Sequence, residues 1–245
     1  MKKIGILLLI SFSSFCQELK QEGIVYFERR TFWVNIMNRL TYLSTEEKDR
    51  LKLTWGSTDE GWKQNMTLAF TPKESLYAYG EDNADEGWSG RKETLFLTKN
   101  FETERSTDYI DILGKSYVVD DTLRSPKWKI LNQIKEVAGF ICMKAETEDP
   151  IKKQKIVAWF AQDIPVPAGP ERYFGLPGLI LELDINDGDV TIIAQKVEWK
   201  KLTKELNLKK LKGKKINDAE YDKIISDYIK ESIKAFRNPY WGLRY

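Results

Sequence analysis

The residue types that perform most enzyme chemistry at neutral pH are scarce in this sequence. It has no histidine and only two cysteines, Cys16 and Cys142. This excludes serine–histidine and cysteine–histidine nucleophilic sites, and it excludes zinc sites built from histidine or from four thiolates. An enzyme would have to use carboxylates, tyrosine, serine or lysine, and we find no catalytic motif built from them. We therefore expect a protein that is not an enzyme, with no catalytic residue, no metal ion and no cofactor.

The densest group of carboxylates lies in one short acidic loop, Glu81–Gly87. Calcium takes oxygen ligands, but Ala84 stands where an EF-hand loop needs a ligand. A pair such as Asp82 and Glu86 could in principle supply the acid and base of a hydrolase. Such a pair needs two carboxylates held in different environments, which one polar loop rarely provides. A solvated loop is the simpler interpretation, and a carboxylate-dependent hydrolase remains a remote alternative.

The residues that we select as ligand or docking candidates are aromatic or belong to a segment rich in glycine and proline. Residues 169–180 read G-P-E-R-Y-F-G-L-P-G-L-I. Glycine allows positive φ or close backbone approach and proline fixes φ, so this segment predicts a sharp corner before a buried strand. The corner is either purely structural or the mouth of a ligand site. The candidates are Trp88, which borders a glycine-containing loop, and Tyr173, Phe174, Gly175, Leu176, Pro177 and Gly178.

The same segment carries a family resemblance. With several blocks upstream, it resembles the GLPGLI family of exported Bacteroidota proteins, whose function is unknown. The family brings no established catalytic residue. Its strand-rich layout is similar to bacterial carriers of lipidated proteins, which are incomplete β-barrels with helices closing an apolar hollow, although a likeness of fold does not fix function. The upstream blocks are Trp128–Ile130, Gly139–Ala145, Ala158–Phe160 and Ile164–Pro165.

The elements that must position these residues are mostly strands. Apolar and charged residues alternate with a period of two and the connections are short, which predicts an antiparallel meander with one solvated face. The fold class is therefore mainly β (α+β), an antiparallel meander sheet or an incomplete barrel with a C-terminal amphipathic helix packed on it. The expected strands are Gly23–Trp33, Lys63–Phe70, Glu74–Tyr79, Glu93–Thr98, Phe101–Asp108, Tyr109–Leu113, Lys115–Asp120, Trp128–Ile134, Val137–Glu146, Lys155–Phe160, Leu179–Ile185 and Val190–Lys200.

Two helices are expected. The first starts at Ser44, whose spacing to Glu47 is that of a capping box, and runs to about Leu53. The second covers residues 218–236, where Asp218 can serve as the cap and apolar residues recur at helical spacing. The apolar stripe predicts that this terminal helix packs on the sheet. Together these elements form one domain, residues 17–245.

The N-terminus has the pattern of a secretory signal peptide. A positive start is followed by a short apolar run and by small residues before a cleavage point, which predicts a signal peptide over residues 1–16. Phe15 is too large for acylation of Cys16, so we favour cleavage, with a lipoprotein as the alternative. No later stretch is long and apolar enough to span a bilayer. We expect an exported protein that is periplasmic, outer-membrane-associated or extracellular, with Cys142 as a core residue.

The charge pattern adds little about partners. The net charge of +2 is small, and export argues against a nucleic-acid partner. A lysine-rich run over residues 196–215 is either a solvated linker or a surface that approaches anionic lipid. The leading hypothesis is a non-enzymatic envelope protein that binds or carries an apolar or lipid-like ligand under the terminal helix. The alternative is a protein-interaction subunit with an outer-membrane protein partner, in an uptake or secretion system.

Overall fold

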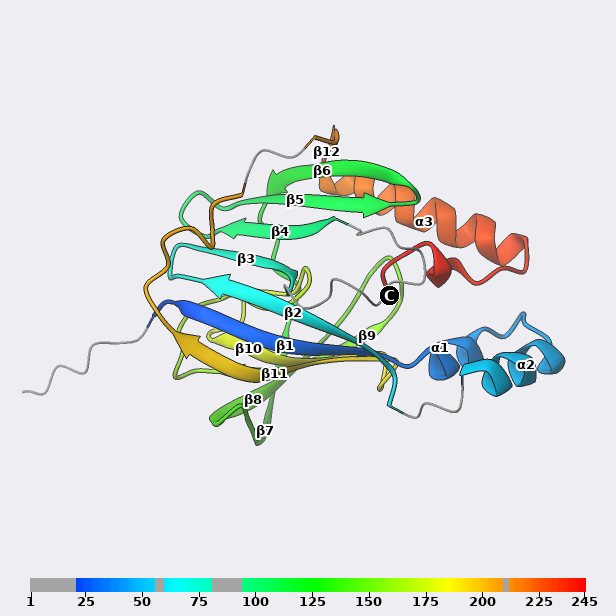
Figure 1. Cartoon of the computed structure of the whole chain (residues 1–245), viewed down its shortest axis with the longest axis horizontal. Coiled ribbons are helices and arrows are strands. Elements are labelled where there is room, and N and C mark those ends of the chain that lie inside the picture. The colour runs from blue at the N-terminus through cyan, green and yellow to red at the C-terminus, as the bar shows by residue number, and fades with distance from the viewer. Residues whose placement is uncertain (1–20, 56–59, 81–93, 209–211) are drawn as a thin grey trace, which may run out of the picture.

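The computed structural model describes residues 21–55, 60–80, 94–208 and 212–245. In this part of the chain the strands form one open sheet of 12 strands, in the order β12-β6-β5-β4-β3-β2-β1-β11-β10-β9-β8-β7 (Figure 1). The strands are β1 (Gly23–Thr31), β2 (Trp62–Phe70), β3 (Glu74–Tyr79), β4 (Leu95–Asn100), β5 (Arg105–Ile112), β6 (Lys115–Thr122), β7 (Lys129–Val137), β8 (Phe140–Glu148), β9 (Lys155–Ala161), β10 (Leu179–Ile185), β11 (Val190–Trp199) and β12 (Lys214–Ile216).

The predicted fold class is confirmed, and the sheet does not close into a barrel. Neighbouring strands pair antiparallel except at one edge, where β12 pairs parallel with β6. The end of the lysine-rich run 196–215, expected as a linker, overlaps β12 at Lys214 and Lys215, so this part of the prediction is wrong. Lys214 and Lys215 are exposed and only Ile216 is buried. The strand is therefore held by backbone pairing, which leaves almost no pattern in the side chains.

Several expected strand boundaries also need correction: Val137 ends β7 and does not begin the next strand, and two further differences lie earlier in the chain. The first strand ends at Thr31, and the chain then turns into the short helix α1 (Trp33–Arg39). Residues 101–104 form a turn, with Glu104 at φ 51°, and not the start of a strand. Beyond that turn β5 is one continuous strand where two were expected. Alternation of side chains runs through both errors, so periodicity alone could not locate these ends.

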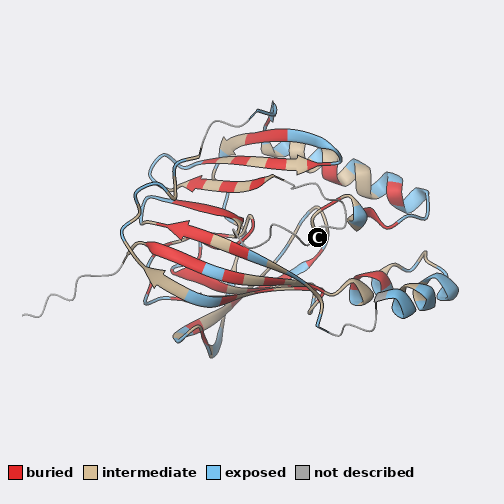
Figure 2. Ribbon diagram, in the orientation of Figure 1, coloured by how far each residue is buried: buried red, intermediate tan, exposed pale blue. Residues whose placement is uncertain are grey.

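The core follows from the alternation of side chains along the strands. On β1, Val25, Phe27, Arg29 and Thr31 are buried while the intervening residues are not, as the red and tan or blue bands of Figure 2 show. Strand β10 is buried on both faces at Leu179, Ile180 and Leu181, each fully inaccessible. Cys142 is also fully buried, as expected. The arginine on the inward face of β1 is the exception that leads to the site.

The helices lie at one end of the sheet (Figure 1). The capping box of α2 (Thr45–Trp55) is confirmed, because Ser44 and Glu47 exchange hydrogen bonds. The terminal helix α3 (Asp218–Lys234) contacts β6 and is two residues shorter than expected. Its cap is Asn217, paired with Glu220 in a second capping box, so Asp218 is the first helical residue and not the cap. No described helix has the length and apolarity to cross a membrane.

The chain ends between α3 and α1. After the 3-10 turn η2 (Pro239–Trp241), the last residues turn inward, and Leu243 and Tyr245 are buried in the core. Trp241 stacks on Trp33 of α1, with ring centroids 4.8 Å apart. The C-terminus therefore forms part of the interior wall of the fold, although no sequence pattern predicts this.

Candidate functional site

A cavity of about 410 Å³ lies between the sheet, α3 and the last residues of the chain. Small-molecule sites in proteins have volumes of roughly 300 to 1,000 Å³, so this cavity is large enough for a small ligand. Its wall combines aliphatic side chains with a group of charged ones. The aliphatic wall consists of Leu95, Leu97, Ile110, Ile112, Leu113, Ile151, Ile185, Ile225 and Leu243.

Glu171 is the centre of the charged group. It is buried, and Arg244 donates two hydrogen bonds to it, from Nε to Oε2 at 2.8 Å and from Nη2 to Oε1 at 2.6 Å. The Tyr77 hydroxyl also donates to Oε1 at 3.3 Å. Burial alone would raise the pKa of Glu171, but Arg244, with help from Arg29 and Lys152, lowers it to about 2. This carboxylate is ionised at any physiological pH.

Arg29 enters from the inward face of β1. Its Nε lies 3.4 Å from Glu171 Oε1, and its Nη1 donates to Thr31 and, at 3.2 Å, to Gln64 Oε1. The Nε atom is buried and donates no hydrogen bond to any described residue. Burial, reinforced by the charge of Arg244, lowers the pKa of Arg29 to about 10. The guanidinium therefore stays charged at neutral pH.

Lys152 completes the charged group from the turn between β8 and β9. Its Nζ donates to the main-chain oxygen of Arg244 at 2.7 Å. Arg244 Nη1 in turn donates to the Tyr79 hydroxyl at 3.0 Å. Burial lowers the pKa of Lys152 to about 8, although Asp149 and Glu171 oppose that shift. Strands and turns that are far apart in the sequence thus bring three cations to one buried carboxylate.

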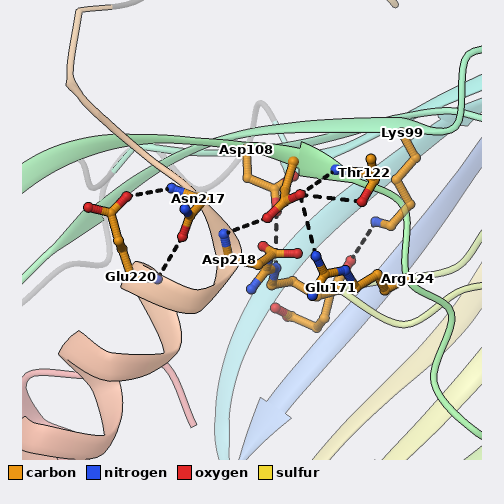
Figure 3. A network of polar contacts seen from close by, with 10 residues as sticks. Lys99, Asp108, Thr122, Arg124, Glu171, Asn217, Asp218 and Glu220 are labelled. Carbon is orange, nitrogen blue, oxygen red and sulfur yellow. Dashed lines mark hydrogen bonds and ion pairs between the residues drawn. The ribbon is translucent and has the colours of Figure 1, made fainter.

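A second ionic cluster connects the glycine- and proline-rich segment 169–180 to α3 (Figure 3). Arg172 Nε donates to Asp108 Oδ2 at 3.0 Å, and Arg172 Nη2 donates to Asp218 at the start of α3. Lys99 donates from Nζ to the main-chain oxygen of Glu171 at 3.1 Å. Burial raises the pKa of Asp108, because Arg172 and Lys99 offset burial only in part. The neighbours Glu171 and Arg172 therefore hold the cavity wall and the terminal helix together.

The structure places the predicted site residues in different surroundings. Trp88, Asp82 and Glu86 lie outside the described residues, as does the predicted signal peptide. Tyr173 lines the cavity. Phe174 is buried, with the Lys99 ammonium 5.5 Å from its ring centroid, and its main-chain oxygen accepts a hydrogen bond from Trp128 Nε1 at 2.8 Å.

The residues after Phe174 form the predicted corner and do not line the cavity: Gly175, Leu176, Pro177 and Gly178. Gly175 has φ 87°, and a Cβ there would lie 2.0 Å from Ser125 Oγ. A Cβ on Gly178 would lie 2.3 Å from the main-chain oxygen of Ala161. Positive φ favours glycine at 175, and close approach of the Ala161 main chain explains Gly178. Leu176 is buried while Pro177 is exposed.

Four residues of the charged group were missed by sequence reasoning: Arg29, Lys152, Glu171 and Arg244. One signal was available. Arg29 has the same parity on β1 as Val25 and Phe27, so period-two alternation places an arginine on an apolar face, where a buried partner is required. Glu171 also stood inside the quoted segment. Nothing local marked Lys152 or Arg244, because their role depends on long-range contacts.

The charged group is suited to binding. A carboxylate with a pKa of about 2 neither donates nor accepts a proton readily at neutral pH, where a general acid or base needs a pKa near the working pH. Fixed guanidinium and ammonium groups recognise anionic or polar groups through charge-assisted hydrogen bonds. Among the described residues, no cluster of three carboxylate or thiol side chains could hold a metal ion.

Comparison with solved structures supports the fold alone. PNGF-II, in two crystal forms, aligns with TM-scores of 0.56 at 12% and 13% identity, covering 83% of this chain. The chain spans about a third of the length of PNGF-II, 33% and 32% in the two forms. An uncharacterized conserved protein from Thermus thermophilus aligns with a TM-score of only 0.40, at 6% identity over 81% of this chain and 91% of its own. No curated protein matches this chain in sequence.

The family comparison falls on the segment that builds the site. Residues 146–182 match the model of a family described as "Protein of unknown function (Porph_ging)". This stretch contains Lys152, Glu171, Tyr173 and the glycine corner. The resemblance predicted from the sequence is thereby confirmed over residues 146–182, which match the model of this GLPGLI-type family of unknown function.

Proposed function

We propose that this chain is an exported binding protein, and not an enzyme, that holds an apolar or lipid-like small molecule. The ligand would occupy the cavity between the sheet, α3 and the C-terminal residues. The observation that carries the proposal is the wall of this cavity, in which aliphatic and aromatic side chains outnumber the charged ones and a fixed charged group surrounds Glu171. Binding sites for small molecules combine an apolar lining with a few well-placed polar groups in the same way.

The construction of the wall supports a preformed site. Leu97 and Ile112 come from the sheet, Ile225 from α3 and Leu243 from the chain end, and all are buried. Arg172 ties α3 to the sheet through Asp218 and Asp108, so the wall does not depend on apolar packing alone. A rigid cavity avoids the ordering cost that a collapsing site pays on binding.

Export is supported by the signal-peptide pattern of residues 1–16, and the absence of histidine supports a role other than acid–base catalysis. The charge state of Glu171 fits the same view, because its pKa of about 2 leaves it ionised in every compartment that an exported protein enters.

A second candidate function is a protein-interaction subunit in the envelope. The observation that favours it concerns the hairpin of β7 and β8, which forms one edge of the sheet. Ile130, Ile134 and Ile141 are 47%, 68% and 56% exposed there. Exposed apolar side chains on an edge hairpin are typical of surfaces that meet another protein.

Native mass spectrometry tests the proposal. Protein purified from envelope extract without detergent should carry an extra mass of a small apolar molecule. Ile225→Trp, which fills the cavity from α3, should abolish that mass. Ile233→Trp is the matched control, because it makes the same change on the same helix at a position that is 44% exposed. Unliganded protein in both variants and in the parent would contradict binding and favour the interaction subunit.

A further inference from the structure

The polar end of the cavity, where the chain end meets the turn before β9, carries more positive than negative charge. Arg29, Arg244 and Lys152 line it with two carboxylates, Glu171 and Asp149. Glu171 is already held by both arginines, and Asp149 Oδ1 accepts two main-chain N–H groups, those of residues 151 and 152, at 2.8 Å each. One cation in excess at a buried position costs free energy unless an anion accompanies it.

Three further charged residues line the wall: Asp111, Asp222 and Arg172. Asp111 lies on β5 and Asp222 on α3, and Arg172 is paired with Asp108 and Asp218. The whole wall thus carries four cations and four carboxylates, and the excess of one cation is confined to Lys152 and the four charged groups that act on it, Asp149, Glu171, Arg29 and Arg244.

Hydrogen-bond donors remain at the same place. Arg29 Nε is buried 3.4 Å from Glu171 Oε1 and donates no hydrogen bond to a described residue. Lys152 Nζ donates to the main-chain oxygen of Arg244. An ammonium has three donors, so two remain for a ligand. The excess charge around Lys152 and these donors thus lie in one part of a wall that elsewhere includes aliphatic side chains.

We infer that the ligand of this cavity carries one carboxylate, which pairs with Lys152 beside Arg29, while its apolar chain lies against Leu97, Ile112 and Ile225. This inference rests on the proposed binding function and names the chemical class of the ligand. A single excess cation matches one negative charge. A phosphate monoester carries about −1.5 to −2 at neutral pH and would leave the site with an excess of negative charge.

Pairing with Lys152 should make the affinity of the protein for a carboxylate ligand depend on pH in one direction. Lys152 must be protonated to pair with a carboxylate, and burial lowers its pKa to about 8. The charged groups that face it are Asp149, Glu171, Arg29 and Arg244. Glu171 and both arginines keep their charge at pH 7 to 9. Affinity for the carboxylate should therefore fall as the pH rises through about 8, while affinity for an uncharged ligand should stay constant.

Titration calorimetry with three probes of one chain length tests this inference: decanoate, decanol and decyl phosphate. At pH 7 decanoate should bind about tenfold more tightly than decanol, because one charge-assisted hydrogen bond corresponds to roughly that factor. Lys152→Met should remove this advantage and remove the pH dependence. Lys153→Met is the matched control, because this neighbouring lysine is exposed and outside the cavity wall.

The outcomes are distinct. Equal binding of decanol and decanoate at pH 7 would overturn the inference and leave the proposed function standing. Tightest binding of decyl phosphate would overturn the choice of carboxylate. Failure of all three probes, together with unliganded protein in native mass spectrometry, would overturn the proposed function itself. If Lys152→Met fails to fold, Lys152→Gln and the pH profile of the parent protein give the same decision, since the profile requires no variant.

Discussion

Two buried carboxylates, Glu171 and Asp108, are both paired with arginine, yet burial and charge set their pKa values in opposite directions. Glu171 receives two hydrogen bonds from Arg244 and has Arg29 at 3.4 Å, and its pKa falls to about 2. Asp108 shares its single arginine, Arg172, with Asp218. Its Oδ1 is buried with no hydrogen bond to any described residue, and burial raises its pKa.

The comparison shows that burial beside an arginine does not by itself decide how a carboxylate behaves. Desolvation raises the pKa at both sites, so the number of cations and hydrogen bonds that each carboxylate keeps for itself decides the outcome. Glu171 also belongs to the cavity wall and anchors the chain end through Arg244. Asp108 helps to hold α3 through Arg172. Around Glu171 the cations therefore more than offset the effect of burial on the pKa, whereas around Asp108 they offset it only in part.

The largest expected effect is that of Glu171→Gln on stability. The substitution keeps the shape of the side chain but leaves Arg29 and Arg244 buried without their anion. Breaking a buried ion pair in this way costs about 3 to 5 kcal/mol of unfolding free energy. Urea unfolding at pH 7 measures it, with Glu148→Gln as the exposed control, since the Glu148 side chain is 65% exposed. A loss no greater than that of the control would show that the cluster contributes little.

The next effect is on the acid limb of the stability curve. Folding lowers the pKa of Glu171 from its usual 4.5 to about 2. Its contribution is therefore complete above about pH 4.5 and is lost as the pH falls toward 2. A shift of this size corresponds to about 3 kcal/mol. Urea unfolding at pH 6, 4 and 3 should show Glu171→Gln approaching the parent protein as the pH falls. A constant difference at all three pH values would contradict this assignment.

Much of the fold could be predicted from the sequence, because strand periodicity and turn residues are local signals. Alternation predicted the antiparallel sheet, and the spacing of Ser44 and Glu47 predicted the start of α2. Strand β12 was not predicted, because backbone pairing holds it in the sheet and its side chains show no alternating pattern. The glycines of the corner at 175 and 178 were recognisable because each needs a backbone position that a side chain would block.

The charged part of the site could not be predicted in the same way. Arg244 stands 73 residues from Glu171 in the sequence, and only the folded chain brings them together. The parity of Arg29 on β1 indicated a buried partner but not which one. Lys152 lies in a turn where a solvated lysine is the ordinary expectation. A site built from long-range pairs leaves single unusual residues in the sequence and does not leave a motif.

The smallest expected effect on stability is that of Asp108→Asn. Its dependence on pH is opposite to that of Glu171→Gln. Asparagine keeps an acceptor for Arg172, which also retains Asp218, so the loss of unfolding free energy at pH 7 should be about 1 kcal/mol. Folding raises the pKa of Asp108 above its usual 3.8, so the charge of this group opposes folding as the pH rises through that range. The cost of Asp108→Asn should therefore be larger at pH 3 than at pH 7, whereas the cost of Glu171→Gln should be smaller at pH 3. Urea unfolding of both variants at the two pH values measures the pair of trends, with Asp120→Asn as the partly exposed control, since the Asp120 side chain is 37% exposed. If the costs of both substitutions changed in the same direction with pH, the pKa values of Glu171 and Asp108 would be shifted in the same direction. That result would contradict the difference drawn between the two clusters.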